Sequence, residues 1–206
     1  MVFSSCLFLF AYLPVVLAVL KLAPSGAGNF CLLAVSLVFY GWSEPAYVPL
    51  MLLSTVVDYI NGRQIERCGE NRRRARRYVL FSVIFNLSLL GFFKYADFFL
   101  SILAALGIPV RPLNLRLPVG ISFYTFQTMS YPIDVYRRQA PAQHSLIRFG
   151  AFVTLFPQLI AGPIVRYRDL SDQLEHPDLS QEQFAAGIVR FCVGLAKKVL
   201  LANQAG

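Results

Sequence analysis

Histidine, tryptophan and paired cysteines are almost missing from this chain of 206 residues, which has two histidines, one tryptophan and four cysteines. The cysteines form no CxxC pair and no histidine cluster surrounds them: they are Cys6, Cys31, Cys68 and Cys192. A structural metal site or a disulfide framework needs closer spacing than this. The sequence therefore predicts no metal site and no bound cofactor.

Charge is missing from five long segments, 2–20, 22–43, 78–93, 117–133 and 149–165. A bilayer core requires about 20 apolar residues of a spanning helix. We expect an all-α polytopic membrane protein, one membrane domain over 1–206, with about six to seven transmembrane or re-entrant helices. The first segment has no basic n-region, which favours an uncleaved transmembrane helix over the alternative, a signal peptide.

The net charge is +8, but its placement does not favour nucleic acid as a partner. Seven arginines lie between two apolar segments, in a predicted loop over 61–77: Arg63, Arg67, Arg72, Arg73, Arg74, Arg76 and Arg77. Such clusters mark the cytoplasmic side and attract anionic lipid headgroups. Counting crossings from this loop predicts an N-terminus outside the membrane.

Polar side chains lie within the apolar segment "LPVGISFYTFQTMSYPIDVY", residues 117–136. At 100° per residue, they share one face of a helix: Tyr124, Gln127, Tyr131 and Asp134. A polar stripe at membrane depth faces either a water-filled cavity or the interior of a bundle. It can also simply hydrogen-bond neighbouring helices together. Periodicity alone leaves both interpretations open.

A second irregular segment, "FPQLIAGPIVRY", contains Pro157, Gly162 and Pro163 within an apolar stretch. It also carries two polar side chains, Gln158 and Arg166. Interrupted helix is tolerated in a bilayer only where protein or a cavity satisfies the freed backbone groups. Together with the polar stripe, this predicts a pathway across the membrane within 117–166. The alternative is a proline kink before an interfacial loop.

The last segment, 180–202, predicts an amphipathic helix. Ser180 and Gln183 have the spacing of a capping box. One apolar stripe follows at helical spacing: Phe184, Ile188, Phe191, Leu195 and Val199. The basic residues lie away from its centre, as expected of a helix on the inner membrane surface or packed against partner helices.

The two blocks "LPVGISFYTFQTMSYPIDVYRR" and "FVTLFPQLIAGPIVRYRDL" resemble the membrane-bound O-acyltransferase (MBOAT) family, in its branch of alginate O-acetyltransferase membrane subunits. The resemblance implies a multi-helix fold around a tunnel, with an acyl donor on one side and an acceptor on the other. It implies six tunnel-lining candidates: Tyr124, Gln127, Tyr131, Asp134, Gln158 and Arg166.

The resemblance also implies what this chain does not supply. The family's catalytic histidine lies in a membrane-embedded, tryptophan-containing motif downstream of these blocks, and neither His144 nor His176 matches it. We therefore expect the N-terminal portion of such an enzyme, with no catalytic residue of its own and inactive alone.

The function implied is O-acyl transfer, with acetyl as the expected group and an exported polysaccharide such as alginate as the acceptor. The acyl donor is not specified by the sequence. Expected partners are membrane lipids, the polysaccharide, and periplasmic or extracellular acetylation proteins. Two alternatives are a non-catalytic membrane subunit of a polysaccharide export or modification complex, and a transporter subunit.

Overall fold

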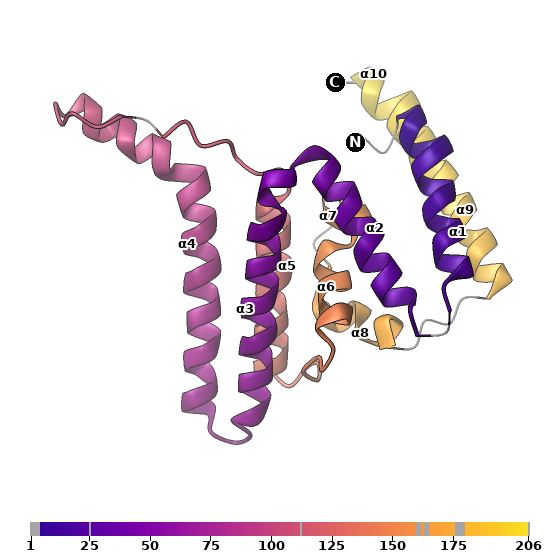
Figure 1. Ribbon diagram of the computed structural model, residues 1–206, viewed down its shortest axis with the longest axis horizontal. Helices are drawn as coiled ribbons and strands as arrows, with labels where there is room; N and C mark the ends of the chain where they lie inside the picture. Colours follow the sequence, from indigo (N-terminus) through magenta and orange to yellow (C-terminus); the bar gives the residue numbers. More distant parts are fainter. Residues whose placement is uncertain are drawn as a thin grey trace.

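The computed structural model describes residues 5–24, 26–111, 113–159, 162, 165–175 and 180–205, and its regular elements there are all helical. Three helices form the centre of the molecule, side by side in Figure 1: α3 (Val48–Arg67), α4 (Arg72–Ala105) and α5 (Ile121–Tyr136). The predicted all-α class is confirmed.

Shorter helices cover the opposite side of α3 and α5 from α4. They are α2 (Gly28–Ser43), α6 (Leu146–Thr154), α7 (Phe156–Leu159) and α8 (Tyr167–Glu175), and α6 packs along α2. The N-terminal helix comprises η1 (Phe8–Tyr12) and α1 (Leu13–Leu22). A small cluster of Phe8, Val16, Phe39 and Phe156 joins it to α2 and α7.

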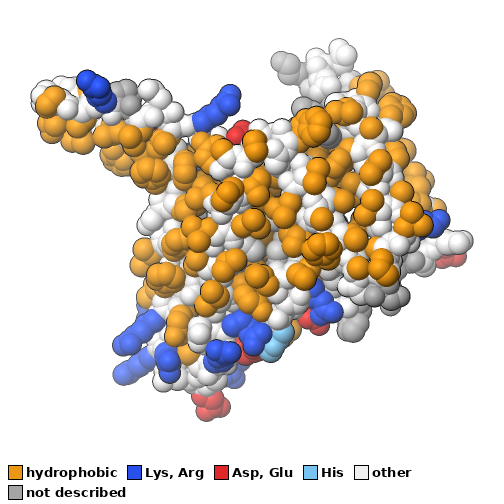
Figure 2. All heavy atoms as spheres, viewed as in Figure 1, with side chains coloured by type: hydrophobic (Ala, Val, Ile, Leu, Met, Phe, Trp, Pro, Cys, Tyr) orange, Lys and Arg blue, Asp and Glu red, His pale blue; other side chains and the backbone are white. Residues whose placement is uncertain are grey.

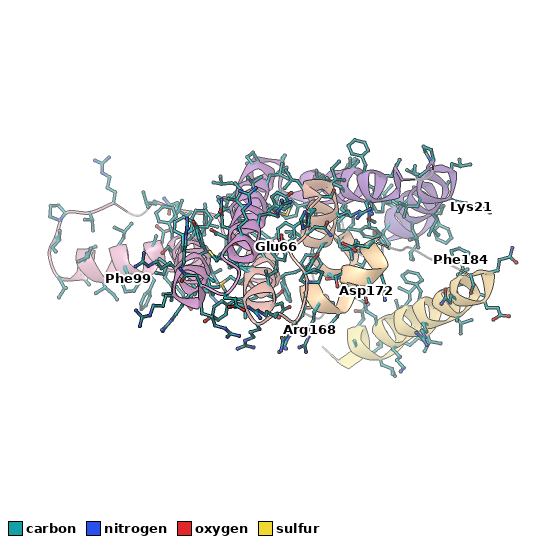
Figure 3. The ribbon with its side chains drawn as sticks, turned by 90° about the horizontal axis from the view of Figure 1, so that it is seen from below. Lys21, Glu66, Phe99, Arg168, Asp172 and Phe184 are labelled. Atoms are coloured by element: carbon teal, nitrogen blue, oxygen red, sulfur yellow. The ribbon has the colours of Figure 1, made fainter. Side chains whose placement is uncertain are left out.

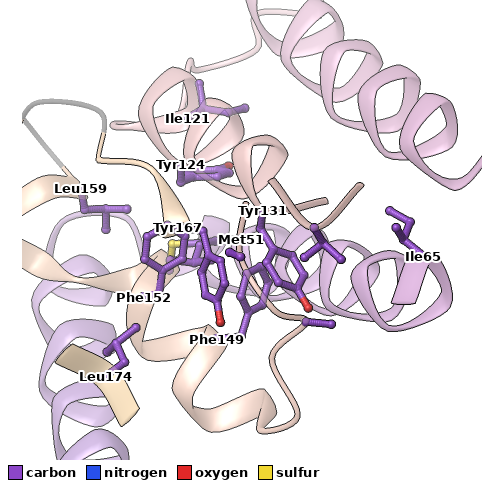
Figure 4. Packing of buried hydrophobic residues seen from close by; sticks show 14 of the residues in the cluster. Met51, Ile65, Ile121, Tyr124, Tyr131, Phe149, Phe152, Leu159, Tyr167 and Leu174 are labelled. Carbon is purple, nitrogen blue, oxygen red and sulfur yellow. The ribbon is translucent and has the colours of Figure 1, made fainter. Parts of the chain in front are cut away.

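Aromatic rings fill the core where α5, α6 and α8 meet, as Figure 4 shows. The Tyr131 ring centroid lies 4.4 Å from that of Phe149 and 4.7 Å from that of Tyr167. Phe152 packs edge-on against Tyr167. Tilted and edge-to-face contacts of this kind add to the stabilisation that burial provides. The irregular second block is therefore anchored to α5 by ring packing.

The predicted arginine loop over 61–77 is wrong in its extent. α3 continues to Arg67 and α4 begins at Arg72, so the connection is residues 68–71. Arginine is a good helix former, which lets both helices continue into the charged segment. Asn71 caps α4 by accepting a hydrogen bond from the backbone N–H of Arg74. Lys and Arg side chains gather at this end of the bundle in Figure 2.

Among the described residues, α4 is the one helix with the length and apolar composition of a membrane span. The N-terminal helix and α2 are apolar but shorter. The sequence predicts about six to seven transmembrane or re-entrant helices. Among the described helices, α4 alone qualifies as a full span by length and composition, because a straight span needs about 20 apolar residues. α2 and α5 have 16 residues each, and the 20-residue α3 ends in a charged segment.

The far end of α4 bends away from the bundle, and residues 113–118 lead from that side back to α5 (Figure 1). Asp97 holds this segment: its carboxylate accepts hydrogen bonds from the backbone N–H groups of Leu113, Asn114 and Leu115, at 2.8–3.2 Å. The Tyr47 hydroxyl donates to the Arg116 carbonyl, 2.8 Å away. The segment that leads into the polar helix α5 is thus held by Asp97 and by Tyr47.

The capping box at Ser180 and Gln183 is present, with both reciprocal hydrogen bonds formed. It opens α9 (Gln181–Ala196), which continues as η3 (Lys197–Ala202) and α10 (Asn203–Ala205). α9 and α1 overlap in Figure 1, but Figure 3 shows them apart, with Phe184 on α9 and Lys21 on α1. The stripe residue Phe184 is 41% exposed. Placement of this helix on a membrane surface stays a prediction.

Candidate functional site

The polar face of α5 is buried, as its helical phase predicts. Tyr124, Gln127, Tyr131 and Asp134 are all 3% exposed or less, whereas Phe126 on the opposite face is 41% exposed. α5 begins after Gly120, whose φ of +78° is left-handed and whose Cα faces the Leu159 carbonyl. The first turn of α5 is therefore packed directly on the end of α7.

Gln127 joins the two sequence blocks. Its Nε2 donates hydrogen bonds to the Phe152 carbonyl, 2.7 Å away, and to Gln158 Oε1, 3.1 Å away. α6 ends at Thr154, just beyond Phe152, and Gln158 lies on α7. A buried amide that satisfies an interrupted helix in this way is costly to remove, because its partners would be left without a donor. Gln127 thus fixes the break between α6 and α7.

Tyr131 leads to a second polar junction. Its hydroxyl accepts a hydrogen bond from the backbone N–H of Gln143, 3.0 Å away. The buried Gln143 side chain in turn donates to the Tyr167 hydroxyl at 3.3 Å and to Glu175 at 3.4 Å. Burial raises the pKa of the Tyr167 hydroxyl to about 12, so this phenol stays neutral near pH 7. The junction locks α8 and the start of α6 against α5.

Asp134 and Arg166 are brought together in a pocket of about 430 Å³ on the side of α5, and the pocket also contains Ser130 and Arg137. The Asp134 carboxylate lies close to the backbone N–H of Arg168, at the start of α8. A carboxylate near the amino end of a helix is stabilising, because the first backbone N–H groups there have no partner within the helix. Asp134 therefore stabilises the start of α8. The second carboxylate oxygen, Oδ2, is buried and has no hydrogen-bond partner in the described structure.

Ser130 also contacts the segment that carries Arg166. Its Oγ accepts a hydrogen bond from the backbone N–H of Tyr167, 3.3 Å away. The pocket therefore has a carboxylate, a hydroxyl and two guanidinium groups around one concave space. Such a set can orient a polar ligand or a hydroxyl by hydrogen bonds and charge.

Tyr124 is set apart from the Asp134 pocket. Its hydroxyl and that of Tyr40 on α2 are both buried, and neither has a hydrogen-bond partner in the described structure. The six candidates thus separate into the Gln127–Gln158 pair, the Asp134–Arg166 pocket, the Tyr131 junction and Tyr124. These contacts are of the kind that bridges helices. Lining of a tunnel by these residues stays a prediction.

Sequence reasoning missed a buried polar cluster between α3, α4 and α5. The Asp58 carboxylate accepts hydrogen bonds from Ser82 Oγ at 2.5 Å and from Asn86 Nδ2 at 2.8 Å. Thr128 of α5 lies 3.4 Å from Asn86 Oδ1. The available signal was the i, i+4 spacing of Ser82 and Asn86 in an uncharged segment, because polar residues at that spacing share one face of a helix.

Among the described residues, no histidine side chain lies at these sites, although the backbone N–H of His144 donates to Gln143 Oε1 at the Tyr131 junction, 2.9 Å away. His144 has a side chain 65% exposed, and its Nε2 lies 3.2 Å from the Glu66 carboxylate. His176 lies outside the described residues. No group of three or more potential metal ligands occurs among the residues described. The part of the chain that is described therefore shows polar positioning groups without a histidine base beside them.

Comparison with known proteins finds a family model that matches part of the chain. Residues 134–203 match the family model of MBOAT, the membrane-bound O-acyltransferase family. This match includes Asp134, Gln158 and Arg166 and begins within α5. The family resemblance of the two sequence blocks is confirmed.

Particular relatives match almost the whole chain. It is 44% identical over 98% of its length to a Pseudomonas aeruginosa protein named "Probable alginate O-acetylase AlgI", covering 40% of that protein. A protein of the same name from Azotobacter vinelandii is 42% identical over 99% of the chain, which covers 42% of it. A Helicobacter pylori "Peptidoglycan O-acetyltransferase" is 31% identical over 99% of the chain, which covers 45% of it.

The chain thus spans less than half the length of these curated relatives. No solved structure matches it.

Proposed function

We propose that this chain forms part of an O-acyltransferase that transfers an acyl group, expected to be acetyl, to an exported polysaccharide. The observation that carries the proposal is the 44% identity over 98% of the chain to a protein named as an alginate O-acetylase. The matched region contains the buried polar face of α5 and the second sequence block, with its proline-interrupted segment. Alginate is the acceptor that the names of these relatives favour.

The reaction joins an acceptor hydroxyl oxygen to the acyl carbonyl carbon, and the bond from that carbon to the donor breaks. A base must remove the hydroxyl proton as the new ester forms. The described residues supply no histidine at the polar sites, so we assign this chain a positioning role. Gln127 fixes the α6–α7 break, and the Asp134 pocket presents a hydroxyl, a carboxylate and guanidinium groups.

The proposal includes a bacterial inner-membrane location with the N-terminus outside. The arginine-rich ends of α3 and α4 support this orientation, because Lys and Arg are retained on the cytoplasmic side. The polysaccharide and acetylation proteins outside the membrane are the proposed partners. No identity of the acyl donor is proposed.

Complementation tests the function. The full-length gene product is expressed in an alginate-producing strain that lacks its own alginate acetylase, and ester content per uronic acid is measured in the secreted polymer. Restored ester content is the expected result. Secreted polymer without ester, in cells that contain the protein in the membrane, would contradict the proposed acceptor and reaction. The alternative of a non-catalytic export subunit predicts a change in polymer yield without a change in ester content.

Residues 1–206 expressed alone form a second arm of the same experiment. No ester is expected, because the histidine that the structure does describe is exposed and paired with Glu66. Ester restored by this shorter chain, and lost again with Asp134→Asn or His144→Ala, would overturn the positioning role and identify the base.

A further inference from the structure

A separate pocket of about 490 Å³ opens at the basic end of the bundle, between the α3–α4 turn and the segment that follows α5. Gly69 and Arg72 line one side of it, and Arg138 and Gln139 line the other. It shares no lining residue with the Asp134 pocket. A volume in this range is typical of small-ligand sites.

Both arginines in this pocket lack a carboxylate partner. Among the described residues, the carboxylates in close contact with a basic side chain are Glu66, which faces His144, and Asp169, which faces Arg168; neither contact involves Arg72 or Arg138. Glu66 also lines the pocket, but its carboxylate lies 3.2 Å from the His144 ring. Figure 3, seen from this end, places Glu66 near the middle of the molecule. Among the described residues, neither guanidinium group is therefore paired with a carboxylate, although Glu66 lines the same pocket.

The backbone adds to the positive potential at the same place. α4 begins at Arg72, and the amino end of a 34-residue helix carries a partial positive charge. Seven arginines and only two glutamates lie between positions 63 and 77. An anion entering the pocket therefore meets a net positive field, which the Glu66 carboxylate in the lining only partly offsets.

The arginines are also positioned rather than free. Arg138 has a left-handed φ of +59° directly after the end of α5, and its Nη2 lies 3.4 Å from the Gly69 carbonyl. The Arg72 guanidinium lies 5.7 Å from the centroid of the Tyr136 ring, within the range of a cation–π contact. Each side chain is thus held at the rim by one contact that leaves most of its five N–H donors available.

We propose that this pocket binds a phosphate group between Arg72 and Arg138. Phosphate presents several acceptor oxygens, and the planar fork of guanidinium donors matches them in pairs. The phosphate can belong to an anionic phospholipid headgroup or to a soluble molecule, since the pocket lies at the charged end of the helices and is open. The two sources share this chemistry and are separated by experiment.

Two probes test the proposal on the full chain purified in detergent. Native mass spectrometry measures retention of dioleoylphosphatidylglycerol, and the thermal unfolding midpoint measures binding of inorganic pyrophosphate. The variants are Arg72→Gln and Arg138→Gln. The matched control is Arg74→Gln, which removes the same charge two residues along α4, about 200° around the helix from Arg72.

Gln139→Glu is a further variant that adds a carboxylate to the pocket without removing a cation. Gln139 is exposed, and its Oε1 accepts a hydrogen bond from Arg168, which a glutamate can also accept. This variant therefore keeps the test valid if either arginine variant fails to fold.

We expect binding of at least one probe to weaken about tenfold in the three pocket variants and by less than about twofold in Arg74→Gln. Lipid retention with no pyrophosphate response assigns a lipid source, and the reverse assigns a soluble one. Equal losses in Arg74→Gln and the pocket variants would reduce the effect to diffuse charge and overturn the site. Absence of binding by both probes would overturn it as well.

Discussion

The Tyr131 ring lies where a β-carbon on Gly62 would have to be placed, so α3 and α5 approach each other through a glycine. The same ring packs in tilted and edge-to-face contacts against Phe149 and Tyr167, and its hydroxyl accepts a hydrogen bond from the backbone N–H of Gln143. One contact therefore sets the spacing of the two helices and the position of the aromatic core. The polar face of α5 depends on it.

Gly62→Ala is expected to destabilise the protein by about 1–3 kcal/mol, because a ring at the centre of a packed cluster cannot move aside without displacing others. The measurement is the unfolding midpoint of the purified protein in detergent. Gly91→Ala is the matched control: nothing lies within 4 Å of a β-carbon at that helical glycine. That control is expected to be neutral or stabilising by up to about 1 kcal/mol. Equal midpoints for the two variants would contradict the close contact.

The Asp58 cluster predicts a difference between two substitutions at one position. Asp58→Leu removes the acceptor of the Ser82 hydroxyl and leaves the Asn86 amide with the Ser82 carbonyl as an acceptor, at a cost of about 1–3 kcal/mol for a buried donor that loses its partner. Asp58→Asn keeps the volume and an acceptor oxygen, so most of the stability is expected to remain. Chemical unfolding in detergent measures both. If Leu is tolerated as well as Asn, the cluster does not hold α3 against α4.

The Asp97 carboxylate is expected to slow hydrogen exchange at the backbone amides that donate hydrogen bonds to it. In Asp97→Ala, hydrogen exchange at residues 113–115 should accelerate about tenfold or more, because three backbone N–H groups lose their acceptor. Lys94→Ala is the control on the same helix, since Lys94 contacts the Tyr95 ring rather than this segment. Unchanged exchange in Asp97→Ala would show that the segment is held by other contacts.

Much of this architecture follows from local sequence rules, and the rest does not. The capping box at Ser180 and the buried phase of Tyr124, Gln127 and Tyr131 depend on spacing along one helix, which the sequence contains. The continuation of α3 and α4 through the arginine segment was missed, because charge marks a membrane boundary without ending a helix.

Contacts between distant segments were beyond sequence reasoning. The pairing of Asp58 with Ser82 and Asn86, and of Gln127 with Phe152, depends on how helices far apart in the chain pack together. Polar residues within apolar segments indicated that partners exist, but not which ones. Asp134 and Arg166 were both selected from the sequence, whereas their shared pocket required the fold.

The orientation of the chain predicts selective labelling at the turn between α3 and α4. An exposed cysteine introduced as Arg74→Cys should react with a membrane-impermeant maleimide only after the cells are opened, because the arginine-rich end is expected in the cytoplasm. The native cysteines are first replaced by serine to remove background. Strong labelling of intact cells at this position would reverse the proposed sidedness.

The central claim is that the polar face of α5 positions the acyl-transfer site. Its most direct test is the ester content of the polymer per molecule of membrane protein. In the full-length gene product, Gln127→Leu and Asp134→Asn are compared with Ser122→Ala, a polar change on the opposite face of the same helix. We expect the first two to lower ester per molecule about tenfold or more, because displaced positioning groups slow a reaction of this kind steeply. Ser122→Ala should leave it near normal. Reduced amounts of protein with normal ester per molecule would contradict the account, and would make these residues helix-packing groups alone.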